Sequence, residues 1–282
     1  MAPARVLLFT ALAMIAFAAN SLLCRIALRE TGIDAASFTA IRIFAGTLTL
    51  WVLVRARANV HVASGSWASA FALFAYAAAF SFAYLSLSAG TGALLLFGAV
   101  QATMILWGLK RGEQLHALQW LGVLVAATGL VVLVFPGLAA PPLVGSALML
   151  SAGVAWGIYS LRGKQSGDPT AATAANFLRA TPMAALLALG CLPMLRPMNG
   201  GAVYAVLSGA LASGLGYAIW YTALPHLRAT SAATVQLSVP VLAAAGGMLL
   251  LGEPITWRFF FAAVAVLGGI ALVIVPRKQR RS

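Results

Sequence analysis

The sequence predicts an all-α integral membrane protein with ten transmembrane helices, arranged as two inverted five-helix repeats with both termini in the cytoplasm. Three observations carry this prediction: an apolar composition, a regular succession of apolar segments, and an internal repeat. Of the 282 residues, 62% are hydrophobic and only 8% are charged, and the mean hydropathy is +0.97. Soluble domains have about 25% charged residues, so this chain lacks the residues for an ordinary water-facing surface.

The apolar segments have the length of membrane spans. A bilayer core about 30 Å thick needs roughly 20 mainly apolar residues per helix, which gives this chain room for about ten spans and no separate soluble domain. The expected spans are 6–27, 35–54, 66–87, 91–109, 117–135, 142–162, 170–193, 202–224, 229–251 and 257–276.

The first segment has some features of a signal peptide, since an apolar run is followed by an Ala-Phe-Ala sequence at 16–18 that resembles a cleavage site. The apolar character continues to Leu28, however, and cleavage would remove one member of the internal repeat. We therefore interpret it as the first transmembrane helix.

The net charge of +13 is distributed by side of the membrane. With a cytoplasmic N-terminus, twelve of the eighteen basic residues fall inside: Arg5, Arg55, Arg57, Lys110, Arg111, Arg162, Lys164, Arg228, Arg277, Lys278, Arg280 and Arg281. Four fall outside, namely Arg25, Arg29, Arg196 and Arg258. This bias fits ten helices with both termini cytoplasmic. The basic C-terminal cluster is then an anchor beside anionic lipid, and no nucleic-acid partner is expected.

The two halves of the chain repeat one another. Residues 16–22 recur at 155–161, an offset of 139, and Gly112-Glu113 recurs as Gly252-Glu253, an offset of 140. These matches divide the chain into repeats 1–137 and 138–282. An odd number of spans per half forces the second half to enter the membrane from the opposite side. Inverted repeats of this kind are typical of secondary transporters, whose halves rock about a site near the midplane.

The Gly-Glu turns also carry a family resemblance. Residues 109–115 and their twin 249–256 resemble the Gly-Glu turn of the drug/metabolite transporter (DMT) superfamily, and the Gly-rich fifth helix of each half fits the same pattern. The resemblance covers the whole chain. It implies the ten-helix fold of the EamA-like carriers, with helices 1, 3, 4, 6, 8 and 9 around a central cavity. Within that group the chain looks most like the bacterial exporters of aromatic amino acids, the YddG type, which implies a multi-pass protein of the bacterial inner membrane.

Each glutamate of these turns follows a glycine that can close the helix end. Lys110 and Arg111 are expected partners of Glu113, and Arg258 is an expected partner of Glu253. We read both glutamates as structural caps of the turn, with a transport role as the alternative.

Polar and aromatic residues in mid-helix are candidates for the transport path, because helices that face lipid have no use for them. Tyr76, Phe80 and Tyr84 form one stripe, and so do Tyr217 and Trp220. The repeat matches Phe80 with Trp220 at mirrored depths, as expected for an outer and an inner gate. The alternative is an interfacial aromatic belt or ordinary helix packing.

The first helix of each half also contains matched aromatic and polar residues. Phe17 and Asn20 match Trp156 and Tyr159. An unpaired buried amide costs roughly 2–7 kcal/mol, so Asn20 needs a hydrogen-bonding partner, which is either a substrate or another helix.

Two glutamines and a proline complete the set of mid-helix candidates. Gln101 and Gln236 raise the same question as Asn20, although they do not align under the repeat. Pro240 lies in the middle of its expected span and is predicted to kink it as a hinge.

Two arginines fall near the middle of expected spans. Arg42 and Arg179 have no acidic residue at a similar depth, and even lenient insertion scales assign about 2.5–3.5 kcal/mol to such a charge. One interpretation is a contact with a substrate carboxylate. The other is that each arginine bonds the carbonyl ends of neighbouring helices and braces the fold, since the family resemblance implies that helices 2 and 7 lie behind the cavity wall.

The expected function is export of small metabolites, aromatic or other hydrophobic amino acids above all, by alternating access of a central cavity. No carboxylate or histidine falls within a span, which favours facilitated diffusion or exchange over proton coupling. The alternatives are a broad-specificity drug/metabolite exporter with ion coupling, an integral membrane enzyme, and a helical scaffold.

Other chemistry has little support in the sequence. Residues 163–165 lack the Ser or Thr and the spacing of a phosphate-binding loop. We find no nucleophile beside a base and no metal-ligand spacing, and we read Cys24 and Cys191 as apolar fillers. No enzyme activity, cofactor or metal is expected. The partners are a small-molecule substrate and the lipid bilayer; a monomer is compatible with the sequence, which leaves the oligomeric state open.

Overall fold

The computed structural model describes residues 2–57, 65–137, 140–163, 168–191, 200–227, 232 and 235–274. Within these ranges every regular element is a helix and there is no strand. The helices of the first half are α1 (Pro3–Glu30), α2 (Ala35–Arg55), α3 (Trp67–Ala83), α4 (Ala89–Lys110) and α5 (Ala117–Val134).

The second half has a similar succession with one irregular member. Its helices are α6 (Leu143–Gly163), α7 (Pro169–Gly190), α8 (Gly201–Leu207), the π-helix η2 (Ser208–Leu215), α9 (Gly216–Ala223), the short 3-10 helix η3 (Leu224–His226), α11 (Ser238–Leu251) and α12 (Trp257–Ile274). The four elements from α8 to η3 follow one another without a break and form one span, Gly201–His226.

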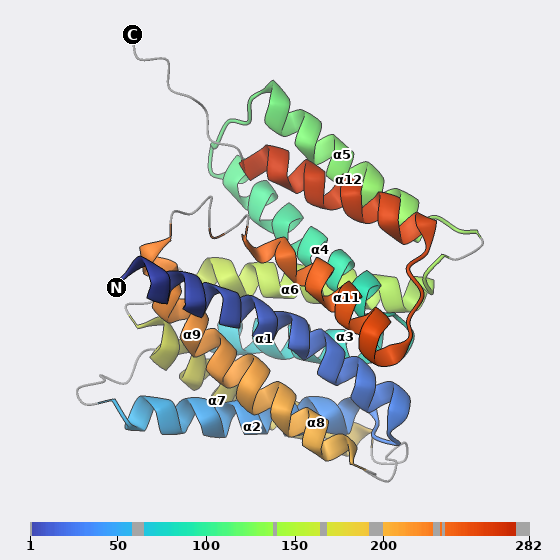
Figure 1. Ribbon diagram of the computed structural model, residues 1–282. Helices are drawn as coiled ribbons and strands as arrows, with labels where there is room; N and C mark the ends of the chain where they lie inside the picture. Colours follow the sequence, from blue (N-terminus) through green and yellow to red (C-terminus); the bar gives the residue numbers. More distant parts are fainter. Residues whose placement is uncertain are drawn as a thin grey trace.

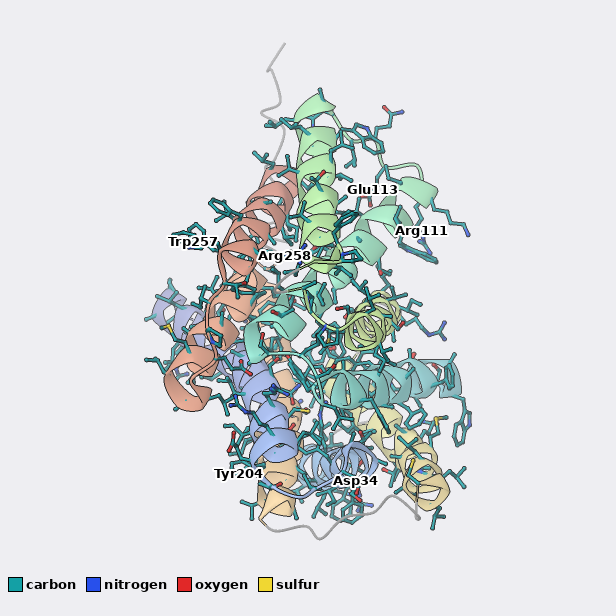
Figure 2. The ribbon with its side chains drawn as sticks, turned by 90° about the vertical axis from the view of Figure 1, so that its right-hand side faces the viewer. Asp34, Arg111, Glu113, Tyr204, Trp257 and Arg258 are labelled. Atoms are coloured by element: carbon teal, nitrogen blue, oxygen red, sulfur yellow. The ribbon has the colours of Figure 1, made fainter. Side chains whose placement is uncertain are left out.

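Seven helices of the described chain are long and apolar enough to cross a membrane: α1, α2, α4, α5, α6, Gly201–His226 and α12. Two apolar helices, α3 and α11, are shorter. Many large apolar side chains of these helices are exposed on the outside of the bundle, as Figure 2 shows for Trp257 at the start of α12. The chain is therefore a multi-pass membrane protein.

Two expected spans differ from the helices observed. The span expected at 66–87 ends at Ala83, because residues 84–87 form turns that lead into Ser88, the N-cap of α4. In the span expected at 229–251, Val235 and Gln236 are helical, Leu237 forms a turn, and α11 begins at Ser238. The helix is thus interrupted three residues before Pro240, and the hinge or kink at Pro240 stays a prediction. Residues 228–231 and 233–234 lie outside the described ranges, as do Lys164, Arg196, Pro276 and the basic C-terminal cluster.

Polar and glycine residues set the helix ends. The Asp34 carboxylate accepts a hydrogen bond from the Ser37 amide at 2.8 Å, which caps α2, and Asp168 caps α7 in the same way. Gly112 and Gly252 have φ of 90° and 62°, a left-handed conformation that favours glycine. The prediction that these glycines close α4 and α11 is confirmed.

Helices from the two halves pack as matched pairs. In Figure 1, α5 and α12 lie side by side and run antiparallel. Their close approach is at two glycines, since a Cβ on Gly122 would lie 2.5 Å from the Gly269 carbonyl oxygen, and the reverse distance is also 2.5 Å. Other pairs are α2 with α7, α4 with α11, α3 with α6, and α1 with α9.

Candidate functional site

A small cavity lies at the centre of the bundle. It has a volume of about 20 Å³, enough for roughly one water molecule, so a larger solute requires its walls to move apart. Its walls are mostly aromatic, and they come from α1, α3, α4, α6, η2, α9 and the residues before α11: Phe17, Asn20, Ser21, Tyr76, Phe80, Leu96, Phe97, Trp156, Ala212, Tyr217 and Gln236. We call this space the central cavity.

Trp156 lies in the middle of the ring contacts. Its indole centroid is 4.9 Å from that of Tyr76, 5.4 Å from that of Tyr159 and 5.1 Å from that of Tyr217. Ring pairs at such distances stabilise one another by about 0.5–1.5 kcal/mol beyond their buried area. Because these residues lie on three different helices, the ring cluster joins the two halves of the chain.

A polar cluster adjoins the rings. The Tyr76 hydroxyl oxygen accepts hydrogen bonds from Asn20 Nδ2 at 3.2 Å and from Arg42 Nη2 at 3.0 Å. The Asn20 carbonyl oxygen accepts one from the Ser208 hydroxyl at 2.6 Å, and Arg42 Nε donates to Ser213 Oγ at 3.4 Å. Asn20 therefore has the buried partners that its amide requires, and they come from other helices.

The π-helix η2 places both serines of this cluster. In a π-helix the backbone hydrogen bonds run from i to i+5, so residues five apart stack on one face. Ser208 and Ser213 are five apart and fully buried, and one faces Asn20 while the other faces Arg42. Sequence reasoning missed both serines, because it assumed a regular α-helix, in which these two positions point in different directions.

Arg42 is the buried charge of the site. The residue is 2% exposed, and its guanidinium carbon lies 5.2 Å from the Tyr76 ring centroid and 4.8 Å from that of Phe80. Its Nη1 atom is buried without a hydrogen-bond partner. The ion pairs in the described part of the chain are Arg25–Glu253 and Arg29–Glu30, and neither includes Arg42. The expected bonds to carbonyl ends of neighbouring helices are not the ones observed, since Arg42 bonds two side-chain hydroxyls.

The predicted path residues fall into two groups. Seven line the central cavity: Phe17, Asn20, Tyr76, Phe80, Trp156, Tyr217 and Gln236. Three lie directly behind them, with Tyr84 against Phe80, Tyr159 against Trp156, and Trp220 against Phe17.

Two further candidates lie apart from the lining. Gln101 is buried on α4 but is not part of the cavity wall. Arg179 Nη1 donates to the Ala175 carbonyl oxygen of its own helix at 3.1 Å. The same Nη1 atom lies beside Gly65, just before α3. Arg179 is only half-buried, so its surroundings differ from those of Arg42.

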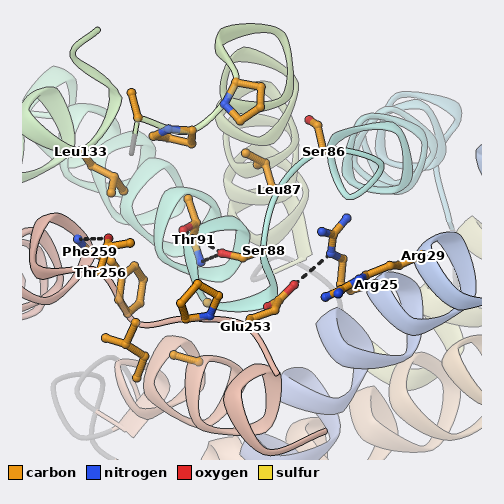
Figure 3. Close-up of a pocket in the computed structure, with 17 residues that line it drawn as sticks. Arg25, Arg29, Ser86, Leu87, Ser88, Thr91, Leu133, Glu253, Thr256 and Phe259 are labelled. Atoms are coloured by element: carbon orange, nitrogen blue, oxygen red, sulfur yellow. Dashed lines mark hydrogen bonds and ion pairs between the residues drawn. The ribbon is translucent and has the colours of Figure 1, made fainter. Parts of the chain in front are cut away.

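A second, larger pocket lies where α1 and α11 end and where α4 and α12 begin (Figure 3). Its volume is about 320 Å³, and we call it the Arg25–Glu253 pocket. Arg25 Nε lies 3.0 Å from Glu253 Oε1, as the dashed line in Figure 3 marks, and Glu253 Oε2 accepts a hydrogen bond from the Ala89 amide at 2.8 Å. The expected partner Arg258 instead donates to the Phe135 carbonyl oxygen at 2.6 Å.

The two Gly-Glu turns differ in burial. Glu253 is 7% exposed, whereas Glu113 is exposed beside Arg111 at the surface (Figure 2). The partner of Arg111 that the structure shows is the Trp107 ring, 5.0 Å from the guanidinium carbon. The two turns therefore share the left-handed backbone conformation of their glycines, but the carboxylate of one turn is buried and that of the other is exposed. No sequence spacing indicated the pairing of Arg25 with Glu253, which are 228 residues apart.

One run of contacts joins the central cavity to the Arg25–Glu253 pocket. The Phe80 ring packs edge-on against Tyr84 at 4.7 Å, and the Tyr84 carbonyl oxygen accepts a hydrogen bond from Arg25 Nη1 at 2.8 Å. The Tyr84 hydroxyl donates to the Ala89 carbonyl oxygen at 3.2 Å. The end of α3 thus lies between the two spaces and contacts both.

The described residues contain no group of three or more His, Cys, Asp or Glu side chains that could hold a metal ion. The arrangement is suited to non-covalent recognition: aromatic faces, hydroxyls and two amides line the cavity, and a buried guanidinium bonds the hydroxyl of Tyr76, one of the lining residues.

Comparisons with known proteins identify relatives of the chain. Residues 143–275 match the model of the EamA-like transporter family. An uncharacterized protein of Pseudomonas aeruginosa is 59% identical over 98% of this chain and 96% of its own length. A probable amino-acid metabolite efflux pump of Escherichia coli is 26% identical over 69% of this chain and 70% of its own length. The threonine/homoserine exporter RhtA of Salmonella typhimurium is 32% identical over 44% of this chain and 43% of its own length.

The fold is also similar to that of a protein solved by crystallography. The TM-score is 0.66 at 17% sequence identity, and the match covers 96% of this chain and 97% of the solved one. The shared fold therefore extends over nearly the whole chain.

Proposed function

Because the chain belongs to the EamA-like transporter family of membrane transporters, we propose that it exports aromatic or other hydrophobic amino acids through the central cavity. The observation that carries this proposal is the ring cluster around Trp156, in a cavity whose wall contains no carboxylate. Aromatic rings bind other rings and apolar side chains favourably. The named relatives, an amino-acid metabolite efflux pump and a threonine/homoserine exporter, support amino acids as the substrate class.

The architecture proposed for this transporter is ten spans in two inverted repeats, 1–137 and 138–282, in a bacterial inner membrane with both termini cytoplasmic. The packing supports it, because exchanging the two halves turns the pair of α3 with α6 into that of α1 with α9, and leaves the pairs α5 with α12, α2 with α7, and α4 with α11 unchanged. The contact of Gly122 with Gly269 and that of Gly129 with Ala262 are related by the same exchange, given the offset of 140. The beginning of α1 and the end of α12 lie toward the same side in Figure 1.

In this orientation the Arg25–Glu253 pocket opens on the outer side. Arg25 ties α1 to the end of α3 and to the turn before α12, so these contacts hold the outer ends of the helices together and close the outer path. Release of the substrate to the outside would separate them, as alternating access requires. Phe80 lies on the outer side of the cavity and Trp220 on the inner side, in the proposed roles of outer and inner gate.

Facilitated diffusion or exchange is the proposed energetics. All five acidic residues lie at helix ends or in the turns between helices. A second candidate, export coupled to protons, is favoured by one observation: Glu253 is the one acidic residue of the five that is buried. An imposed pH gradient distinguishes the two, because it drives uptake into proteoliposomes in a proton-coupled carrier and has no effect in a facilitative one.

The test is uptake of labelled amino acids into proteoliposomes that contain the purified protein, compared with protein-free liposomes. L-phenylalanine, L-tryptophan, L-leucine and L-threonine span the substrate classes at issue. Saturable uptake of the aromatic and aliphatic amino acids is the expected result. Uptake of L-threonine alone would place the substrate with that of the threonine/homoserine exporters, and uptake of none would overturn the proposal.

A further inference from the structure

We infer that Arg42 is a carboxylate-binding residue, and that a carboxylate in the central cavity replaces the Tyr76 hydroxyl as the acceptor for its guanidinium. The inference rests on the proposed function and deepens it, since it assigns the group that recognises the acid end of the substrate. It also separates Arg42 from Arg179, the other mid-span arginine of the sequence.

The first argument is the charge balance around Arg42. The five acidic residues of the chain, Glu30, Asp34, Glu113, Asp168 and Glu253, all lie in the described ranges, at helix ends or turns. None of them bonds Arg42. A buried cation without a carboxylate partner is costly, because desolvation is not offset by an opposite charge. An anion that reached this guanidinium would supply the missing charge.

The second argument is the number of donors. A guanidinium has five N–H donors in a planar fork, and it cannot lose its proton in a protein. Arg42 has two acceptors, the Tyr76 hydroxyl at 3.0 Å and the Ser213 hydroxyl at 3.4 Å, while Nη1 has none. Nη1 and Nη2 together form the edge that binds the two oxygens of a carboxylate.

The third argument is the position of Tyr76. Tyr76 lines the central cavity, and its hydroxyl oxygen accepts from two donors, Asn20 Nδ2 and Arg42 Nη2. A carboxylate has about four lone-pair sites, so it could accept from both donors and from Nη1 as well. Movement of the Tyr76 hydroxyl would open the guanidinium edge to the cavity, and Asn20 would bind the same carboxylate from α1.

The rings define the rest of the ligand. The Arg42 guanidinium carbon lies over the adjoining rings of Tyr76 and Phe80, and Tyr76 also packs against Trp156, with ring centroids 4.9 Å apart. A ligand with its carboxylate on Arg42 would therefore place its other end among aromatic side chains. The chemical class that fits is a carboxylic acid with an apolar or aromatic substituent.

Arg179 does not share these features. Its guanidinium bonds its own helix at Ala175, lies beside Gly65 and is half-buried. It is therefore the matched control: an arginine in the corresponding helix of the second repeat that is not among the residues of the cavity wall.

The experiment measures binding to the purified full-length protein by quenching of its tryptophan fluorescence. The probes are L-phenylalanine and 3-phenylpropionate, which carry a carboxylate, and L-phenylalaninamide, which does not. We expect the wild-type protein to bind the two acids roughly 10- to 100-fold more tightly than the amide, the ratio for a charge-assisted hydrogen-bonded pair. Arg42→Gln should abolish this ratio, Arg42→Lys should keep part of it, and Arg179→Gln should keep all of it.

Equal affinity of the wild-type protein for acid and amide would overturn the inference, as would absence of acid binding or an equal loss in Arg179→Gln. If Arg42→Gln does not fold, the inference is still tested by the ratio of acid to amide affinity in the wild-type protein and in Arg42→Lys. The result is separable from the proposed function. An Arg42-dependent preference for acids without amino-acid transport contradicts only the function, and transport with equal affinity for acid and amide contradicts only this inference.

Discussion

Trp156 is the side chain on which the ring cluster of the central cavity depends. It is half-buried and contacts three tyrosine rings from α3, α6 and α9, namely Tyr76, Tyr159 and Tyr217. Because the cavity volume is only about 20 Å³, a substrate has to displace some of these ring contacts to enter. At this scale the rings both close the cavity and supply the surface that a substrate would meet.

We expect Trp156→Ala to lower kcat/KM for L-phenylalanine transport about tenfold, because the substrate loses a ring that contributes about 1 kcal/mol or more. Trp257→Ala is the control, since Trp257 is 76% exposed on the outside of α12. Transport rates in proteoliposomes, normalised to the amount of reconstituted protein, measure both. Unchanged kcat/KM in Trp156→Ala would remove this residue from the transport path.

Most single residues of the cavity could be predicted from the sequence, and the reason is the repeat. The offset of 139 aligned Phe17 with Trp156, and a four-residue spacing identified Tyr76 and Phe80. Ser208 and Ser213 could not be predicted in this way, because their alignment depends on a π-helical turn that hydrophobic periodicity does not indicate.

At the scale of helices, two glycines determine how closely α5 and α12 approach. Gly269 is buried against the Gly122 carbonyl oxygen, whereas its neighbour Gly268 is exposed and a Cβ there would meet nothing within 4 Å. The sequence analysis used the Gly-rich fifth helix only as part of the family resemblance. It did not indicate which of the two glycines contacts α5, since that depends on the rotation of α12 about its axis.

We expect Gly269→Ala to destabilise the protein by about 1–3 kcal/mol, because the new methyl group would overlap backbone atoms of α5 that have no room to move. Gly268→Ala should be neutral or slightly stabilising, since alanine favours the helix. Thermal unfolding of the purified variants in detergent measures the difference. Equal melting temperatures for the two variants would contradict the observed packing of these helices.

The ion pair of the Arg25–Glu253 pocket is the other contact between elements that carries a prediction. Glu253→Gln leaves the Arg25 guanidinium without its carboxylate, and removal of one partner from a buried pair costs about 3 kcal/mol. Glu113→Gln changes the repeat twin, which is exposed, and should alter stability by less than about 0.5 kcal/mol.

The same two variants test the outer closure. If the pair holds the outer side closed, Glu253→Gln should also make a cysteine placed at Ser21, on the cavity wall, react faster with a reagent added from outside. Equal effects of Glu253→Gln and Glu113→Gln on melting temperature and on labelling would show that the pair has neither role.

At the scale of the whole molecule, the proposed topology places the exposed residues Glu30 and Pro254 outside and Arg57 and Gln114 inside. With Cys24 and Cys191 replaced by alanine, a single cysteine at each of the four positions can be labelled in intact cells with a membrane-impermeant maleimide. Labelling of the first two and protection of the last two is the expected pattern. Labelling of Arg57→Cys or Gln114→Cys from outside would contradict the inverted-repeat topology.

The class of helical membrane protein could be predicted from composition alone, because a chain with 62% hydrophobic and 8% charged residues cannot cover an ordinary water-facing surface. The pairing of helices from the two halves depends on side-chain shape and did not follow from composition. The same holds for the asymmetry between Glu113 and Glu253, which are equivalent in the repeat but differ in burial.

The central claim is that the molecule is an alternating-access carrier of amino acids, and counterflow tests it most directly. Proteoliposomes preloaded with unlabelled L-phenylalanine are diluted into a trace of labelled L-phenylalanine, with no ion gradient imposed. The account predicts a transient accumulation of label inside above its external concentration, which is absent from protein-free liposomes and reduced in Trp156→Ala. Equilibration of label without any such overshoot would indicate a channel or a leak and would contradict the account.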